Sequence, residues 1–214
     1  MNRLDHIVIA AASLEQGGEY LRELLGVDVP IGGVHATMGT HNLVMQLGGD
    51  SYLEVIAIDP AGRVPEHPRW FDLDRLSMRA MLAERPRLIT WVINTPDLDG
   101  LVNRTGFDIG TPAAFSRDSL QWDIAVTDDG RLLAGGMLPY CIQWHSKPHP
   151  SRAMANLRCR LQKLTIHHNR PQWIAARLES LGAGHLVEIE VIPDSESPHL
   201  SAIIETPKGP VKLD

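Results

Sequence analysis

Two strand-like segments each contain one polar side chain that can bind a metal ion or carry a proton. His6 interrupts the apolar run from Leu4 to Ala11, and Glu54 interrupts the run from Tyr52 to Ile58. Burying an imidazole or a carboxylate in such a strand costs free energy unless the group has a partner. Because alternate residues of a strand share a face, each side chain points either into the core or into a pocket. We therefore predict that His6 and Glu54 lie on the same concave face of a sheet, within direct or water-bridged reach.

The His6–Glu54 pair has two interpretations. Imidazole and carboxylate donors suit Mn²⁺, Fe²⁺, Zn²⁺ or Ni²⁺, and a metal with open coordination positions can polarise a substrate oxygen. The other interpretation is a buried ion pair that only holds two strands together.

His41 is the candidate third donor, and its direction depends on the hairpin that follows it. Its strand and the strand from Tyr52 to Ile58 flank the turn residues Gly48 to Ser51, which supply the positive φ angles of tight turns. An even number of loop residues puts His41 on the same face as Glu54, and an odd number turns it to the other side. The sequence leaves both possibilities open, and His41 also fits a strand-start residue bonded to the backbone.

The elements that position these residues follow a repeated order. Residues 1–59 read as strand, helix and strands, with a capping-box signature at Ser13 and a helix end at Gly26. Residues 60–86 carry four prolines around one helical stretch, which indicates a connector and not a domain. Residues 87–150 repeat the order of strand, helix and strands.

The last segment, residues 151–214, has the pattern of a C-terminal βαββ extension. It is either a partial extra module or a set of strands that completes or extends the sheet of the second module.

This order, together with several short motifs, resembles the glyoxalase-like branch of the vicinal oxygen chelate superfamily (glyoxalase, bleomycin resistance and extradiol dioxygenase proteins). The matching motifs are Thr40-His41-Asn42, Tyr52-Leu53-Glu54, the segment from Pro139 to His145, and Pro148-His149-Pro150. The resemblance covers most of residues 1–150. It implies an α+β fold of tandem βαβββ-like modules, with curved mixed sheets and outer helices. It also implies that His6 and Glu54 hold a divalent metal (Zn, Mn, Ni or Fe).

The second module departs from the metal-dependent pattern of this family. Aligning the two modules by sequence puts Trp91 at the position of His6 and Ile142 at the position of Glu54, and neither side chain can bind a metal. A shift of one residue would offer only Gln143, a weak neutral ligand. With so few donors, we expect any divalent metal to be weakly bound or absent.

The second module does supply aromatic surface for a ligand. Trp side chains are seldom wholly buried and their N–H groups need partners, so several on inward strands suit the wall of a pocket. The predicted substrate-binding residues are Met45, Trp91, Trp122 and Trp144. Ordinary core packing is the alternative for any one of them. His145 and His149 lie at a strand end and in a loop, where either could act as an acid or base.

The composition of the chain limits the classes of partner that it is expected to bind. The formal net charge is −6 without a basic cluster, which argues against nucleic acid. No apolar run approaches the roughly 20 residues that cross a bilayer, and the two cysteines form no disulfide framework, so we expect a cytoplasmic protein. A small molecule is the expected partner, and a homodimer is compatible with the sequence.

Two functions follow from these features. In the first, the protein is an enzyme of lyase, isomerase or dioxygenase type that acts on a small oxygenated substrate. The expected catalytic residues are Glu54, His41 and His149: His6 and Glu54 orient a metal or the substrate, and His41 or His149 moves a proton. In the second, the protein binds or sequesters a small molecule without catalysis. The sequence does not decide whether the protein is an enzyme.

Overall fold

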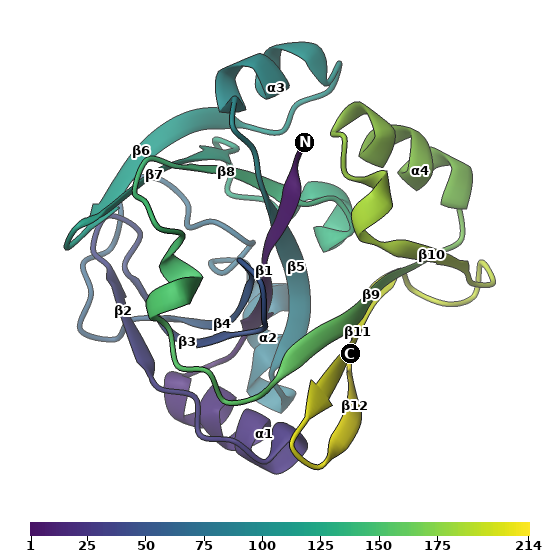
Figure 1. The fold of residues 1–214 in the computed structure, drawn as a ribbon. Coiled ribbons are helices and arrows are strands. Elements are labelled where there is room, and N and C mark those ends of the chain that lie inside the picture. Colours follow the sequence, from purple (N-terminus) through teal and green to yellow (C-terminus); the bar gives the residue numbers. More distant parts are fainter.

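An eight-stranded mixed sheet contains most of the N-terminal three quarters of the chain (Figure 1). The computed structural model describes residues 1–214. The strands of this sheet are β1 (Arg3–Ala10), β2 (Ile31–His35), β3 (Thr40–Gln46), β4 (Tyr52–Ile58), β5 (Arg87–Asn94), β6 (Thr111–Arg117), β7 (Leu120–Val126) and β8 (Tyr140–Trp144). Their spatial order is β2-β3-β4-β1-β5-β8-β7-β6.

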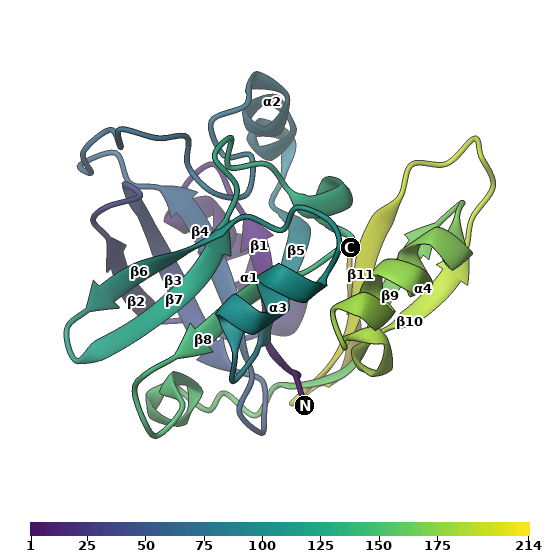
Figure 2. The ribbon, with the colours of Figure 1, turned by 90° about the horizontal axis from the view of Figure 1, so that it is seen from above.

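This order is that of two βαβββ modules joined through their first strands. In the first module β1 pairs in parallel with β4, and β3 and β2 follow outward. In the second module β5 pairs in parallel with β8, and β7 and β6 follow. The two modules meet where β1 pairs antiparallel with β5. The sheet curves until its edge strands β2 and β6 lie beside each other, which nearly closes a barrel (Figure 2). The expected tandem fold is confirmed.

Helix α1 (Leu14–Leu25) covers the outer face of β3 and β4. It begins where the sequence predicts, because the Ser13 hydroxyl accepts a hydrogen bond from the backbone N–H of Gln16. It ends at Gly26, whose φ of 71° is the left-handed conformation that glycine adopts without strain. Its buried leucines lie on the side that faces the sheet.

The connector contains helix α2 (Leu76–Glu84), and helix α3 (Leu98–Arg104) follows β5. Three short 3₁₀ turns cover Leu133–Gly136, Pro150–Ala153 and Gly184–Leu186. Strands β2 and β6 were not expected from the sequence. Neither segment has the usual strand pattern, because β2 contains Gly32 and Gly33 and β6 contains Pro112. Glycine and proline are disfavoured in strand interiors.

The C-terminal residues form a second sheet. It consists of β9 (Arg160–His168), β10 (Glu188–Val191), β11 (His199–Thr206) and β12 (Gly209–Leu213), in the order β10-β9-β11-β12, with helix α4 (Pro171–Ser180) between β9 and β10. The strands therefore neither complete nor extend the sheet of the second module. Both edges of β8 are already paired, with β5 and β7, so no C-terminal strand can pair with it.

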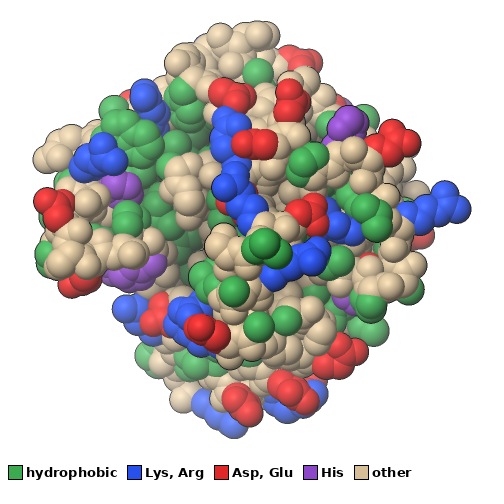
Figure 3. Space-filling model, turned by 180° about the vertical axis from the view of Figure 1, so that it is seen from behind, with side chains coloured by type: hydrophobic (Ala, Val, Ile, Leu, Met, Phe, Trp, Pro, Cys, Tyr) green, Lys and Arg blue, Asp and Glu red, His purple; other side chains and the backbone are tan.

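Charged side chains of both signs are interspersed over the surface, as the face in Figure 3 shows. Ion pairs such as Arg75–Asp72 and Arg85–Asp214 contribute to this pattern. None of the helices combines the length and the apolarity that crossing a bilayer requires.

Candidate active site

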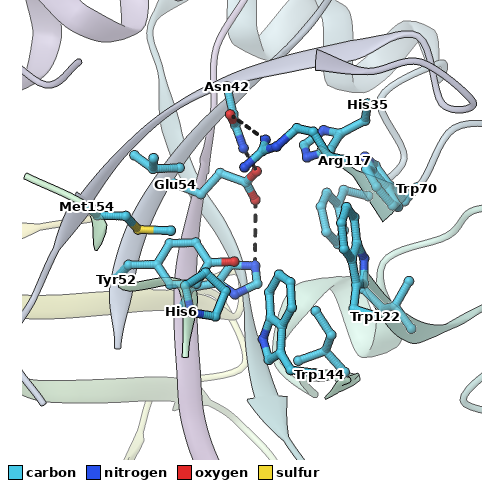
Figure 4. A pocket seen from close by; sticks show the side chains of 15 residues that line it. His6, His35, Asn42, Tyr52, Glu54, Trp70, Arg117, Trp122, Trp144 and Met154 are labelled. Atoms are coloured by element: carbon cyan, nitrogen blue, oxygen red, sulfur yellow. Dashed lines mark hydrogen bonds and ion pairs between the residues drawn. The ribbon is translucent and has the colours of Figure 1, made fainter. Parts of the chain in front are cut away.

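A pocket opens inside the curved sheet, on the face opposite α1 (Figure 4). Its cavity volume is about 40 Å³, it is partly open to solvent, and apolar side chains make up most of its wall. Its lining residues are His6, His35, Asn42, Val44, Tyr52, Glu54, Trp70, Phe71, Arg117, Trp122, Ile124, Ile142, Trp144, Pro150 and Met154. The first module contributes most of the polar groups, and the second module and the connector contribute most of the aromatic ones.

A β-bulge at Asp5 aims two successive polar side chains at each other. Leu4 pairs with Ile93 of β5 and His6 pairs with Val92, so Asp5 has no partner of its own across the strands. A bulge of this kind lets neighbouring side chains depart from strict alternation. Asp5 Oδ1 consequently lies 2.7 Å from His6 Nδ1.

The Asp5 carboxylate is fully buried and surrounded by donors. Besides His6, it receives hydrogen bonds at Oδ2 from Trp144 Nε1 (2.8 Å), His149 Nε2 (3.0 Å) and Asn94 Nδ2 (3.2 Å). Burial alone would raise the pKa of Asp5, but the hydrogen bonds from His149 and His6 and their charges hold it at about 2. Asp5 is therefore ionised at neutral pH. An ionised carboxylate only accepts hydrogen bonds, so His6 Nδ1 carries the proton of the bond between them.

The other ring nitrogen of His6 faces Glu54. The parallel register pairs His6 with Tyr52 and Val8 with Glu54, which puts His6 and Glu54 on one face of the sheet. His6 Nε2 lies 3.6 Å from Glu54 Oε2, longer than an ordinary hydrogen bond, and both side chains are buried. The second oxygen of Glu54 accepts a 2.6 Å hydrogen bond from Asn42 Nδ2. The structure thus brings together the two polar residues that the sequence singles out.

Tyr52 fixes the orientation of the His6 ring. The two rings stack with their centroids 4.4 Å apart and an angle of 19° between their planes. Burial, together with the negative charges of Asp5 and Glu54, raises the pKa of Tyr52 well above its ordinary value. Its hydroxyl therefore stays protonated and can donate a hydrogen bond.

His41 and Met45 lie on the other face of the sheet. Five residues separate the paired positions Gln46 and Tyr52, so the hairpin loop is odd and Val44, not His41 or Met45, shares a face with Glu54. His41 faces α1 and lines a surface hollow there. Met45 is fully buried in the core. The structure brings neither residue to the pocket.

The predicted aromatic residues divide in the same way. Trp122 and Trp144 line the pocket with their ring centroids 5.2 Å apart. Trp91 pairs with Ile7 on the opposite face, where it is fully buried and its indole N–H donates to the Met137 carbonyl. The connector adds Trp70, which the sequence analysis did not assign to the site.

The loop histidines lie outside the pocket. His149 does not line the pocket, and its Nε2 donates a hydrogen bond to Asp5. Its Nδ1 is near the backbone N–H and the hydroxyl of Ser151. His145 pairs with Asp123 at 2.8 Å near the exposed end of β8. His149 is thus placed to hold Asp5 but does not line the pocket.

Four polar residues of the site were not assigned from the sequence: Asp5, Asn42, His35 and Arg117. Two adjacent polar residues at the start of an apolar strand were the available signal for Asp5. His35 and Arg117 come from β2 and β6, the strands whose pattern is hidden. His35 bonds to the Thr40 hydroxyl, and burial lowers its pKa to about 4, so its ring is neutral at pH 7.

The residues present do not fit a divalent metal centre of the kind that the fold family implies. Only His6 Nε2 and Glu54 Oε2 are directed at a common point, because Asp5 occupies His6 Nδ1 and Asn42 occupies the other Glu54 oxygen. No group of three or more His, Cys, Asp or Glu side chains has an arrangement that could hold a metal. Three protein ligands are the usual minimum for a catalytic zinc site.

Comparisons with known proteins agree with this architecture. The family described as "Glyoxalase-like domain" matches residues 4–182. A crystal structure of a hypothetical protein from Staphylococcus aureus covers 99% of this chain and 84% of its own, with a TM-score of 0.60 and 11% identity, which shows a shared fold. Methylmalonyl-CoA epimerase from Mycobacterium tuberculosis covers 70% of this chain and 91% of its own, with a TM-score of 0.41 and 18% identity. No curated protein matches the chain.

Proposed function

The chain belongs to the glyoxalase-like domain family, and from that premise we propose that it is an enzyme that transfers a proton on a small oxygenated organic substrate. The substrate class is a carbonyl compound with a C–H bond next to the carbonyl group. The reaction is of isomerase or lyase type, and its proton carriers are His6 and Glu54.

The observation that carries this proposal is the arrangement of His6 between two carboxylates. Asp5 accepts the Nδ1 proton at 2.7 Å, which leaves Nε2 as the ring position that faces the pocket. A histidine held by a buried carboxylate can accept a proton at its free nitrogen, because the carboxylate orients the ring and stabilises the imidazolium that forms. Asp5 is therefore a positioning residue and His6 is the base.

Glu54 is the second proton carrier of the site. Its 3.6 Å separation from His6 Nε2 leaves both groups accessible from the pocket, and Asn42 fixes its orientation. Two carriers on the same wall can remove a proton at one substrate position and return one at another. Tyr52, with its protonated hydroxyl, is available to bind a substrate oxygen.

A non-catalytic binding function is the second candidate. The observation that favours it is the aromatic wall of Trp70, Phe71, Trp122 and Trp144, which could hold a planar molecule by stacking alone. In that case the polar pair would orient the ligand without moving a proton.

Hydrogen–deuterium exchange separates the two functions. The protein is incubated in D₂O with a panel of small 2-oxo acids and hydroxyketones, and proton NMR follows loss of the signal next to the carbonyl. We expect exchange in the parent and a loss of about 10²-fold or more in His6→Gln and in Glu54→Gln, since general acid–base catalysis contributes that much. His41→Gln, on the opposite face, is the control and should keep the parent rate.

The result that would contradict the catalytic proposal is ligand binding without proton exchange. If a member of the panel binds, as detected by saturation-transfer NMR, but the parent exchanges no proton on it, the catalytic proposal is wrong for that class of compound and the binding function is favoured.

A further inference from the structure

One cationic side chain in the pocket has no anionic partner. Arg117 comes from β6 and lines the pocket beside Asn42, as Figure 4 shows. Its one hydrogen bond, from Nη1 to Asn42 Oδ1, is long at 3.4 Å, and no carboxylate lies within 4.0 Å of its guanidinium. A guanidinium has five donors, so most of the hydrogen-bonding capacity of Arg117 is unused.

The route of Arg117 into the pocket depends on Gly33. Strands β2 and β6 lie side by side at the seam of the barrel, and the Arg117 side chain crosses this seam over Gly33. A Cβ atom at Gly33 would lie 2.8 Å from Arg117 Cδ and 2.9 Å from its Nη1. Any larger residue at position 33 would therefore displace the guanidinium.

The guanidinium is at one end of a chain of polar contacts that leads to the proposed proton carriers. Arg117 donates to Asn42, Asn42 donates to Glu54, and Glu54 faces His6. A bound molecule that touches both Arg117 and His6 must therefore be short, with its charged group a few bonds from its reacting carbon.

We propose that Arg117 binds the carboxylate of the substrate, which makes the substrate class of this site a small organic acid with an apolar or aromatic portion. Arginine matches a carboxylate through two parallel N–H···O bonds, and Trp122 and Trp144 supply the surface for the apolar portion. This inference depends on the proposed function for where the ligand binds. It does not depend on which reaction takes place there.

Three probes with the same phenylethyl portion and different head groups test the charge. They are 3-phenylpropanoate, its neutral amide 3-phenylpropanamide, and 2-phenylethylphosphonate, and their binding is measured by tryptophan fluorescence and calorimetry. We expect the parent to bind the carboxylate about tenfold or more tightly than the amide, because a charge-assisted hydrogen bond contributes that much. Tighter binding of the phosphonate than of the carboxylate would overturn the carboxylate assignment.

Two variants locate the preference. Arg117→Met removes the guanidinium, and Gly33→Ala displaces it without changing any of the side chains that line the pocket. Both should reduce the preference for the carboxylate to about twofold or less, with amide binding unchanged. Arg104→Met, at an exposed ion pair with Asp97, and Gly18→Ala, on α1, are matched controls that should retain it.

The outcomes separate this inference from the proposed function. Equal binding of acid and amide by the parent, or a preference that survives Arg117→Met, overturns the role of Arg117 but leaves proton transfer by His6 intact. If none of the three probes binds, the inferred substrate class is wrong, whereas the exchange experiment still tests the reaction. Melting temperatures of both variants close to that of the parent show that they fold.

Discussion

The two modules have the same strand order and opposite chemistry. In the first module His6 pairs with Tyr52, and in the second Val92 pairs with Tyr140. By this register Val92 occupies the position of His6 and Ile142 occupies the position of Glu54. Aligning the two modules by sequence puts Trp91 at the position of His6, which is wrong by one residue. Val92, like Trp91, has no side-chain atom that can bind a metal.

This difference shows that the two modules contribute different parts of the site. Val92 and Ile142 are buried and need no polar partners. The buried polar groups of the first module do need them, and Asp5 alone takes four donors, of which Asn94, Trp144 and His149 come from residues after the first module. The apolar module therefore supplies the wall of the pocket and part of the support for the polar module.

The largest expected effect is on stability, and it tests whether the polar cluster depends on Asp5. Asp5→Ala leaves the donors of His6, His149 and Trp144 without their acceptor, so the free energy of unfolding should fall by about 3–5 kcal/mol. Ile142→Val, in the apolar module, should cost about 1 kcal/mol. Urea unfolding followed by circular dichroism measures both. A loss below about 1 kcal/mol for Asp5→Ala would show that water replaces the carboxylate.

The second effect comes from making the two modules alike. The double variant Val92→His with Ile142→Glu adds an imidazole and a carboxylate at the positions of His6 and Glu54. We expect it to bind Zn²⁺ or Mn²⁺ about a hundredfold more tightly than the parent, since four donors replace two. Calorimetry and the metal-dependent rise in melting temperature measure this. A parent that keeps one divalent ion per chain after dialysis against chelator would contradict the donor count, and Gln143, His145 or His149 would become the donors to test.

The third effect is on the pH dependence of the free energy of unfolding. His35 and Asp5, two buried groups of the first module, contribute to it in different pH ranges. Burial lowers the pKa of His35 to about 4, below the ordinary value of 6.5 for histidine. The unfolded chain therefore binds the proton more readily, so the stability from neutral His35 is complete above pH 6.5 and is lost as pH falls toward 4. The loss is at most about 1.4 kcal/mol per pH unit.

His35→Gln should flatten this part of the stability profile relative to the parent. The Asp5 contribution has a different window, because its pKa of about 2 lies below the ordinary 3.8, so its stability is lost only as pH falls from about 4 to 2. Unfolding measured between pH 7 and 4 tests the first window. An unchanged slope in His35→Gln would mean that the ring is solvated.

The sequence predicted those parts of the fold that depend on local signals. Ser13 and Gly26 mark the ends of α1 because capping is decided within a few residues. His6 and Glu54 were recognisable because each interrupts an apolar strand. The parallel pairing of β1 with β4 puts the two side chains on one face of the sheet.

The rest of the site depends on features that no local pattern contains. Strict alternation puts Asp5 and His6 on opposite faces, and only the bulge against β5 brings them together. Arg117 reaches Asn42 because the barrel nearly closes, which is a property of the whole sheet. The direction of His41 depends on one loop residue more or less, and glycine-rich turns fit both lengths.

The smallest expected effect concerns that direction and tests the two faces of the first module against each other. His41→Gln and Met45→Leu change residues that face α1 or the core, so binding of a pocket ligand should change by less than about twofold, the size of an effect without direct contact. Trp144→Phe makes a wall residue smaller and removes a donor to Asp5, and should weaken the same binding by about tenfold. Fluorescence titration with 3-phenylpropanoate compares the three variants. If His41→Gln weakens binding as much as Trp144→Phe does, the hairpin has the even register in solution, and His41 with Met45 belongs to the pocket face after all.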